Sequence, residues 1–184
     1  MTRRLEPLRT RRLLLRPFTD ADLAVVVGIQ SARDTHPHES APRTPQEART
    51  QFDSWRQHWA EHGYGYLAVE RTGIPGVIGV GGVQATELGG ERVLNLYYRF
   101  RPEVWGRGYA PEMAAEVLRW AQRELPERPV VIVTNVTNAP ARRVAAKLAF
   151  REYRRALYAG APAVYYRRDP AHGAVGGTGE DGTR

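Results

Sequence analysis

The stretch Trp105-Gly106-Arg107-Gly108-Tyr109-Ala110-Pro111-Glu112 is the most informative part of the chain. It lies between a strand-like run, residues 92–100, and an amphipathic helical pattern over residues 111–124. A glycine loop at the start of a helix leaves backbone N–H groups uncovered, and the positive end of the helix dipole favours an anion there. The stretch therefore predicts a diphosphate site, held by the N–H groups of residues 107–110.

Two better-known glycine loops do not fit this stretch. The dinucleotide-binding fingerprint needs a third glycine, which Pro111 replaces, and it follows the first strand of its fold rather than the fourth. The phosphate loop of nucleotide hydrolases needs a Gly-Lys-Ser/Thr ending, which is absent. An anion-binding turn and a tight strand-to-helix turn without a ligand stay open as alternatives.

The length and composition limit the class of protein. The 184 residues suit one domain, which we expect over residues 1–169, followed by a disordered glycine-rich tail over residues 170–184. The absence of cysteine excludes disulfides, thiolate nucleophiles and thiolate metal sites. The chain has no run of 18 apolar residues, so we expect no membrane span. No apolar segment of the kind found in a signal peptide follows the arginines of residues 1–5. We therefore expect a cytoplasmic protein without a signal peptide.

The net charge of +7 is carried almost entirely by arginine, since Lys147 is the only lysine among 27 basic residues. A basic surface suits an anionic partner such as a polyphosphate, a nucleic acid or a ribonucleoprotein. A coding bias toward arginine explains the skew equally well. Because no aromatic–basic RNA motif is present, nucleic acid binding ranks last.

Hydrophobic periodicity predicts a mixed sheet with crossover helices. Residues 44–47, Thr-Pro-Gln-Glu, form a capping box that opens a helix, Gly63 ends that helix, and residues 88–90, Leu-Gly-Gly, form a hairpin turn. The predicted order is β-α-α-β-β-β-α-β-α-β-β. Strands are expected at residues 12–18, 64–70, 77–86, 92–100, 130–133, 151–158 and 164–168, and helices at residues 20–30, 45–62, 111–124 and 141–148.

Three segments in this order resemble the GNAT-fold N-acetyltransferases, and in particular the branch of ribosomal-protein N-terminal acetyltransferases called RimJ/RimL-like. Residues 95–110 are similar to the fourth strand and acetyl-CoA loop of that family. Residues 13–23 are similar to the opening strand and turn of the branch, and residues 138–150 to its second cofactor-binding helix. The resemblance spans residues 13–168.

The resemblance implies an α+β sandwich with a mostly antiparallel sheet of six to seven strands and about four helices, in which the fourth and fifth strands splay apart. It implies acetyl-CoA as donor and a primary amine as acceptor. The pantetheine arm would lie in the splayed gap, where free strand N–H groups near Phe100 would polarise the thioester carbonyl. The cofactor-binding residues implied are Tyr98, Phe100, Trp105, Gly106, Arg107, Gly108, Tyr109, Ala110, Asn138 and Arg143, with Arg142 and Lys147 as further candidates for the outer phosphate.

The chain lacks the acid–base residues that many relatives carry. Asn95 stands where many have a glutamate base, and Ala141 and Ala145 stand where many have a serine or a tyrosine that protonates the thiolate. At pH 7 about a tenth of an α-amino group is neutral, because its pKa is near 7.7–8.0, whereas a lysine amine near 10.4 is almost wholly charged. Orienting two bound reactants contributes about 7–11 kcal/mol, more than acid–base work. We therefore expect an active enzyme that prefers a peptide N-terminus to a lysine.

The catalytic residues stay unassigned, with Asn95, Tyr98 and Glu91 as weak candidates. Glu87 and Glu91 flank the hairpin turn, from which either could reach an acceptor amine through water. Tyr98 and its neighbour Tyr97 alternate across a strand, so one is expected in the cofactor gap and the other in a core.

Four histidines are further candidates. His36 and His38 lie in a loop that the resemblance places over the acceptor site. His58 and His62 have the i, i+4 spacing of metal ligands, but the sequence offers no third ligand, so we expect no metal.

Two other functions stay open from the sequence alone. One is a non-catalytic module that binds acyl-CoA as a sensor or scaffold, which the missing acid–base residues would suit. The other is an acetyltransferase of small amines such as aminoglycosides or polyamines. Relatives are often dimers, so a homodimer is one alternative for the assembly.

Overall fold

The computed structural model describes residues 4–170, which form an eight-stranded sheet with four α-helices. The strand order is β1-β2-β3-β4-β5-β6-β8-β7, and all neighbouring strands are antiparallel except β5 and β6. The strands are β1 Leu8–Arg9, β2 Leu13–Arg16, β3 Tyr66–Arg71, β4 Ile74–Leu88, β5 Glu91–Phe100, β6 Val130–Asn135, β7 Arg151–Tyr158 and β8 Ala161–Arg168; the helices are α1 Leu23–Ser31, α2 Pro45–His62, α3 Tyr109–Glu124 and α4 Ala139–Lys147.

This architecture confirms the predicted fold class. The strand that the sequence missed is β1, whose two residues are too few to show a period. The predicted tail lies, from residue 171 on, outside the described residues. Among residues 4–170, no helix is both long and apolar enough to cross a membrane.

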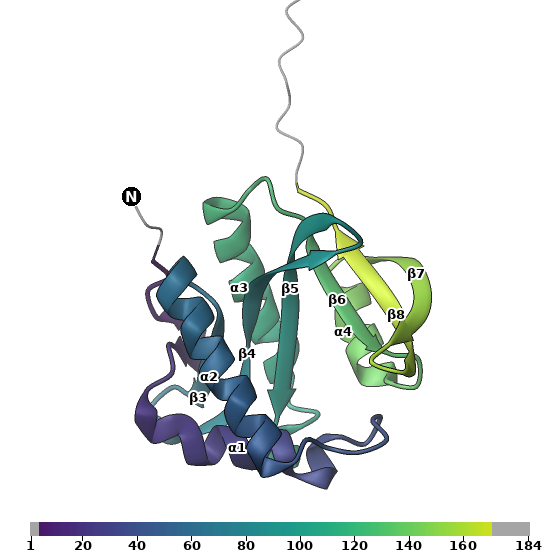
Figure 1. Cartoon of the computed structure of the whole chain (residues 1–184). Helices are drawn as coiled ribbons and strands as arrows, with labels where there is room; N and C mark the ends of the chain where they lie inside the picture. The colour runs from purple at the N-terminus through teal and green to yellow at the C-terminus, as the bar shows by residue number, and fades with distance from the viewer. Residues whose placement is uncertain (1–3, 171–184) are drawn as a thin grey trace, which may run out of the picture.

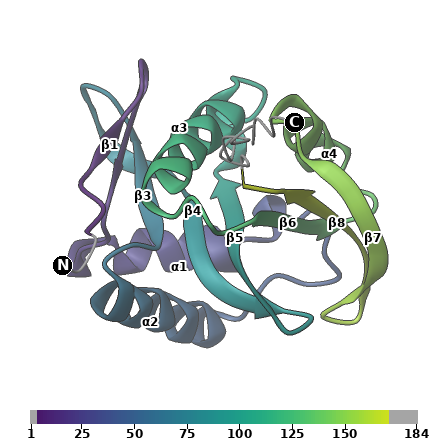
Figure 2. The same ribbon diagram turned by 90° about the horizontal axis from the view of Figure 1, so that it is seen from above.

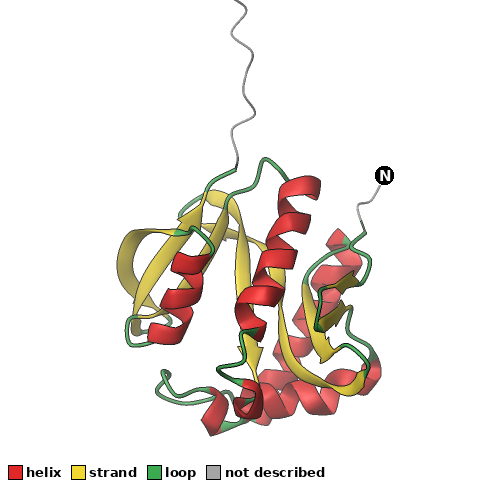
Figure 3. Ribbon diagram, turned by 180° about the vertical axis from the view of Figure 1, so that it is seen from behind, coloured by secondary structure: helices red, strands yellow, loops and turns green. Residues whose placement is uncertain are grey.

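The helices cover the sheet on both faces. Helices α1 and α2 pack on one face, while α3 and α4 pack on the other (Figures 2 and 3). The larger hydrophobic core lies under α3 and includes Met113, Val117 and Trp120, and a smaller core around Phe52 and Trp55 lies under α2. Phe52 and Trp55 therefore belong to a packing face of α2.

Local signals set the ends of α2 as predicted. The hydroxyl of Thr44 accepts a hydrogen bond from the N–H of Glu47, and the Glu47 carboxylate accepts one from the N–H of Thr44. Gly63 ends the helix in the left-handed conformation, with φ of 75°. The capping box therefore sets the start of α2 and the end of the segment between α1 and α2.

The start of α3 differs from the expectation. The helix begins at Tyr109 rather than Pro111, because Gly108, with φ of 76°, is its N-cap residue. Pro111 still lies in the first turn, where its missing N–H leaves no intrahelical hydrogen bond unmade.

Strands β5 and β6 separate soon after they meet. Their parallel pairing consists of Leu94 with Val130 and Asn95 with Val131, and both strands then continue, β5 to Phe100 and β6 to Asn135. Figure 1 shows the two ribbons diverging beyond this point. The predicted splay between these two strands is therefore present.

Candidate active site

The diverging edge of β5 carries backbone groups with no strand beside them. The N–H of Leu94 donates to the carbonyl oxygen of Pro129, at 2.9 Å, so even-numbered residues of β5 direct their backbone groups toward β6. The pairing of β5 with β4 runs without a bulge to Phe100, which preserves this alternation. The N–H groups of Tyr98 and Phe100 therefore face the gap, beyond the last paired residue of β6.

The glycine loop presents a second set of free N–H groups. Gly106 and Gly108 both have positive φ, 71° and 76°, and the loop turns directly into α3. None of the amides of residues 106–110 donates a hydrogen bond to another described residue. A Cβ at Gly106 would meet nothing within 4 Å. The loop thus offers an open, electropositive concave surface of the kind that holds a phosphate.

A cavity of about 380 Å³ joins the glycine loop to the gap between β5 and β6. This volume lies in the usual range for small-molecule sites. Residues from both faces of the sheet line it. They are Thr35, His36, Pro37, His38, Glu39, Tyr98, Arg99, Phe100, Val104, Trp105, Gly106, Gly108, Tyr109, Ala110, Pro111, Asn138, Pro140, Ala141, Arg143, Val144 and Lys147.

The first turns of α4 contribute polar and basic groups to the cavity. Asn138 caps the helix, since its Oδ1 accepts a hydrogen bond from the N–H of Ala141, while its Nδ2 has no partner among the described residues. Arg143 and Lys147 lie one turn apart, and neither forms an ion pair within residues 4–170. Arg142 instead donates to the hydroxyl of Tyr166 and does not line the cavity. Two cations without an ion-pair partner among the described residues therefore line the same cavity as the glycine loop.

The residues before β2 hold the glycine loop in place. Arg12 donates from Nη1 to the carbonyl oxygen of Arg107 at 3.0 Å, and its guanidinium lies 4.7 Å from the ring centre of Tyr109. Glu112 accepts hydrogen bonds from Arg12 and from the hydroxyl of Thr10. Burial raises the pKa of the Glu112 carboxyl, whereas the hydrogen bonds from Thr10 and Arg12 lower it. The net effect is a pKa below the ordinary value. Nothing in the sequence pattern predicts this contact, because its partners lie about 100 positions apart.

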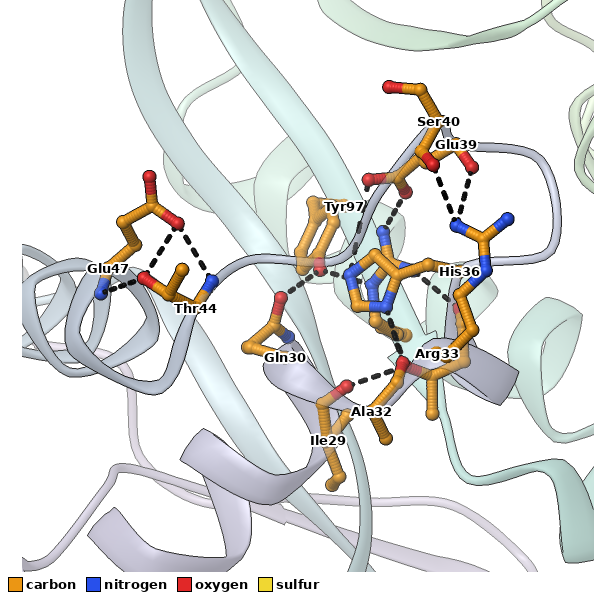
Figure 4. Close-up of polar contacts among 12 residues, drawn as sticks. Ile29, Gln30, Ala32, Arg33, His36, Glu39, Ser40, Thr44, Glu47 and Tyr97 are labelled. Carbon is orange, nitrogen blue, oxygen red and sulfur yellow. Dashed lines mark hydrogen bonds and ion pairs between the residues drawn. The ribbon is translucent and has the colours of Figure 1, made fainter.

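The segment between α1 and α2 forms the opposite end of the cavity. Arg99 of β5 fixes it, donating from Nη1 to the carbonyl oxygen of Thr35 at 2.5 Å and forming an ion pair with Glu39. The Nε of Arg99 donates to the hydroxyl of Tyr97, which donates in turn to Gln30. Figure 4 shows this network converging on the segment. His38 contacts the hydroxyl of Thr137 at 3.2 Å, across the gap between the strands.

The weak catalytic candidates are not brought together. Tyr98 lines the cavity, and its buried hydroxyl has no hydrogen-bond partner within residues 4–170. Asn95 does not line the cavity and donates to the hydroxyl of Tyr66, at 2.7 Å. Glu91 is paired with Arg167 at the hairpin and does not line the cavity. Glu87 does not line the cavity either.

The alanines that replace the acids of relatives differ in position. Ala141 lines the cavity, whereas Ala145 is fully buried in the main core and does not. Of the predicted cofactor residues, Arg107 alone is absent from the lining; its carbonyl contacts Arg12.

The histidine pair on α2 serves the fold. His58 contacts the carbonyl oxygen of Tyr64 through Nδ1 and accepts the N–H of Ala85 through Nε2, so both ring nitrogens are used. The ring of His62 lies 4.2 Å from that of His58, centre to centre. Within residues 4–170, no three metal-ligating side chains gather at one place.

Comparison with known proteins agrees with this geometry. The model of the acetyltransferase (GNAT) domain family matches residues 12–151. Solved structures with the same fold include an acetyltransferase from Agrobacterium tumefaciens (23% identity, TM-score 0.78, 91% of this chain and 96% of that one). They also include Mycobacterium smegmatis RimJ in complex with CoA-disulfide (20% identity, TM-score 0.68, 89% and 85%) and the ribosomal-protein-S5-alanine acetyltransferase of Vibrio fischeri (14% identity, TM-score 0.73, 90% and 97%). These solved structures share the fold of this chain.

The family match covers most of the chain and includes the splayed strands, the glycine loop and most of α4. Open backbone amides, two unpaired cations and a through-sheet cavity are what a donor carrying a diphosphate and an acyl thioester requires. The chain belongs to the GNAT acetyltransferase domain family and is an acetyl-CoA-dependent N-acetyltransferase.

Proposed function

We propose that the enzyme transfers the acetyl group of acetyl-CoA to the α-amino group of a peptide or protein N-terminus. The observation that carries the proposal is that one cavity is lined by the glycine loop at one end and by the carboxylate of Glu39 at the other. Donor and acceptor can therefore approach from opposite faces of the sheet and meet where β5 leaves β6. Holding both reactants in this way supplies much of the rate enhancement.

The donor fits the residues that are present. The free amides of residues 106–110 would hold the diphosphate, and Arg143 and Lys147 would neutralise the outer phosphate. The N–H groups of Tyr98 and Phe100 would bind the pantetheine arm and polarise the thioester carbonyl. The orphaned hydroxyl of Tyr98 then gains a function, because it can donate a hydrogen bond to the departing sulfur.

The acceptor end favours a single ammonium group. Among the described residues that line the cavity, Glu39 is the only carboxylate. A polyamine or an aminoglycoside carries several positive charges, which one carboxylate already paired with Arg99 cannot match. An α-amine also loses its proton far more readily than a lysine near pH 7. A cytoplasmic location and a homodimer remain predictions of the same proposal.

The experiment is a thiol-release assay with acetyl-CoA against three acceptor classes, namely peptides, aminoglycosides and polyamines. Mass spectrometry of the peptide product then locates the acetyl group. We expect turnover with peptides and acetylation at the N-terminus. Faster turnover with aminoglycosides or polyamines, or acetylation mainly on lysine, would contradict the proposed acceptor.

A further inference from the structure

His36 is a buried histidine whose proton position follows from its contacts. Its side chain is 0% exposed, and its Nδ1 lies 2.9 Å from the carbonyl oxygen of Ala32 and 2.7 Å from the hydroxyl oxygen of Thr35. The Thr35 hydroxyl donates to the carbonyl oxygen of Ile29, at 2.7 Å, so toward His36 it accepts. Nδ1 therefore faces two acceptors, carries the proton and donates it. In the neutral ring Nε2 therefore has a free lone pair, and this buried atom has no hydrogen bond to another described residue.

The nearest acidic group to that lone pair is the carboxylate of Glu39. Its Oε2 lies 3.9 Å from Nε2 of His36, while its Oε1 pairs with Arg99. Figure 4 shows the carboxylate of Glu39 above the imidazole of His36. The side chain of Glu39 is 40% exposed and lines the cavity. Glu39 thus stands between the acceptor end of the cavity and the buried base.

The groups around His36 keep its ring neutral. Burial lowers the pKa of His36, and the positive charge of Arg99 on β5 lowers it further. Arg43 acts in the same direction, whereas the nearby Glu39 and the Ala32 carbonyl act against it. The net direction is downward, so the lone pair is available at pH 7. Asn95, at the position where many relatives have a glutamate base, contacts Tyr66 instead.

We propose that Glu39 binds the ammonium form of the acceptor and relays its proton to Nε2 of His36, so that the two residues together form the general base. This inference rests on the proposed function. The ammonium loses one proton to His36, and the neutral nitrogen attacks the thioester carbonyl carbon. The C–N bond forms and the C–S bond breaks. The thiolate takes the second nitrogen proton, the amide keeps the third, and His36 releases its proton to solvent through Glu39.

The test compares two acceptors of one peptide sequence on three variants. The first acceptor has an ordinary N-terminal α-amine, and the second has an N-terminal aminooxy group, whose nitrogen is already neutral at pH 7. His36→Asn keeps an amide N–H in place of Nδ1–H and removes the Nε2 lone pair. Glu39→Gln removes the negative charge at the cavity and keeps an amide oxygen that can accept the hydrogen bond from Arg99. Asp34→Asn is the matched control, since Asp34 is an exposed carboxylate of the same segment that does not line the cavity.

With the ordinary peptide, we expect kcat/KM to fall about 10²-fold or more for His36→Asn and for Glu39→Gln. With the aminooxy peptide, both variants should keep kcat/KM within about threefold of the unmodified enzyme, because proton removal is no longer needed. Asp34→Asn should match the unmodified enzyme with both acceptors. Equal losses with both acceptors, or no loss with either, would overturn the proposal.

Failure of the proposed function gives a different result. In that case the unmodified enzyme itself does not turn over the ordinary peptide and acts on another amine class. The variants are then assayed on the amine that is accepted. A loss of less than about threefold there would reject His36 and Glu39 as the base.

Discussion

Arg12 forms an ion pair with Glu112, with 2.6 Å between Nη2 and Oε2. The pair joins the turn before β2 to the first turn of α3, across 100 positions of the sequence. The same guanidinium binds the carbonyl oxygen of Arg107, so it contacts both sides of the glycine loop. The conformation of the glycine loop thus depends on a residue outside the cavity.

Removal of this contact should weaken donor binding. In Arg12→Ala the loop loses hydrogen bonds that involve charged groups, each worth about 1.5–3 kcal/mol. We expect the KM for acetyl-CoA to rise about tenfold while kcat changes less than threefold, as measured by steady-state kinetics. Arg11→Ala is the control, because it removes the same charge from an exposed neighbour. If both variants raise KM equally, the effect is one of net charge and not of loop geometry.

The shape of the glycine loop can be tested with two glycines. Gly106 and Gly89 both have positive φ, 71° and 61°, and both have open space where a Cβ would lie. Alanine should destabilise the fold equally at either position, by about 1–2 kcal/mol, because both are left-handed. Only Gly106→Ala should raise the Kd for acetyl-CoA in calorimetry, by about tenfold, since its methyl group points into ligand space. A Kd that is the same in both variants would remove the loop from the donor site.

The hydroxyl of Tyr98 should act on the departing thiolate. Burial raises its pKa, so it stays protonated throughout the working pH range and can donate. Tyr98→Phe should lower kcat about 10- to 100-fold. It should leave thermal stability unchanged or slightly higher, because a buried group without a partner is removed.

Tyr97→Phe provides the contrast. It removes hydrogen bonds to Gln30 and Arg99 on the other face of β5 and should destabilise the fold by about 1–2 kcal/mol. Full kcat in Tyr98→Phe would mean that the departing sulfur does not need a hydrogen bond from Tyr98.

The fold and the glycine loop could be predicted because their signals are local. Three signals each occupy only a few consecutive residues: the period-2 pattern of each strand, the capping box at Thr44, and the glycine pair at 106 and 108. The start of α3 was missed by two residues, since nothing local distinguishes Gly108 as an N-cap from a loop glycine.

The acceptor end could not be predicted in this way. Glu39 lies 60 positions from Arg99, and in the sequence each resembles an ordinary solvated charge. The sequence analysis named Glu87 and Glu91 as candidates instead. Both flank a hairpin turn and neither lines the cavity. Only tertiary packing tells a catalytic carboxylate from a surface one.

His58 connects α2 to the sheet beside the start of β3. The pairing of β3 with β4 stops at Gly82, and the N–H of Ala85, three residues further on, donates to Nε2 of His58 at 3.2 Å. Because Nε2 must stay unprotonated to accept this hydrogen bond, a positive charge on the ring would break it. Burial is the main cause that lowers the pKa of His58, and the neighbouring His62 adds to it.

This lowered pKa predicts that acid weakens the fold before the carboxylates titrate. Above pH 6.5 the ring is neutral in the folded and unfolded chains, so the contribution of His58 to the free energy of unfolding is present in full. As the pH falls below 6.5, the unfolded chain takes up the proton first, and this stability is lost. The loss continues until the pH reaches the pKa of His58 in the folded chain. The slope is at most about 1.4 kcal/mol per pH unit for this group.

Urea unfolding at pH 7, 6 and 5 should show this decline in the free energy of unfolding. The variant His58→Gln keeps a donor and an acceptor without titrating, so it should make the decline shallower. His36 has a shift in the same direction and accounts for a remaining slope, which His36→Asn in the same background should remove. An unchanged slope in His58→Gln would mean that His58 does not carry the acid sensitivity.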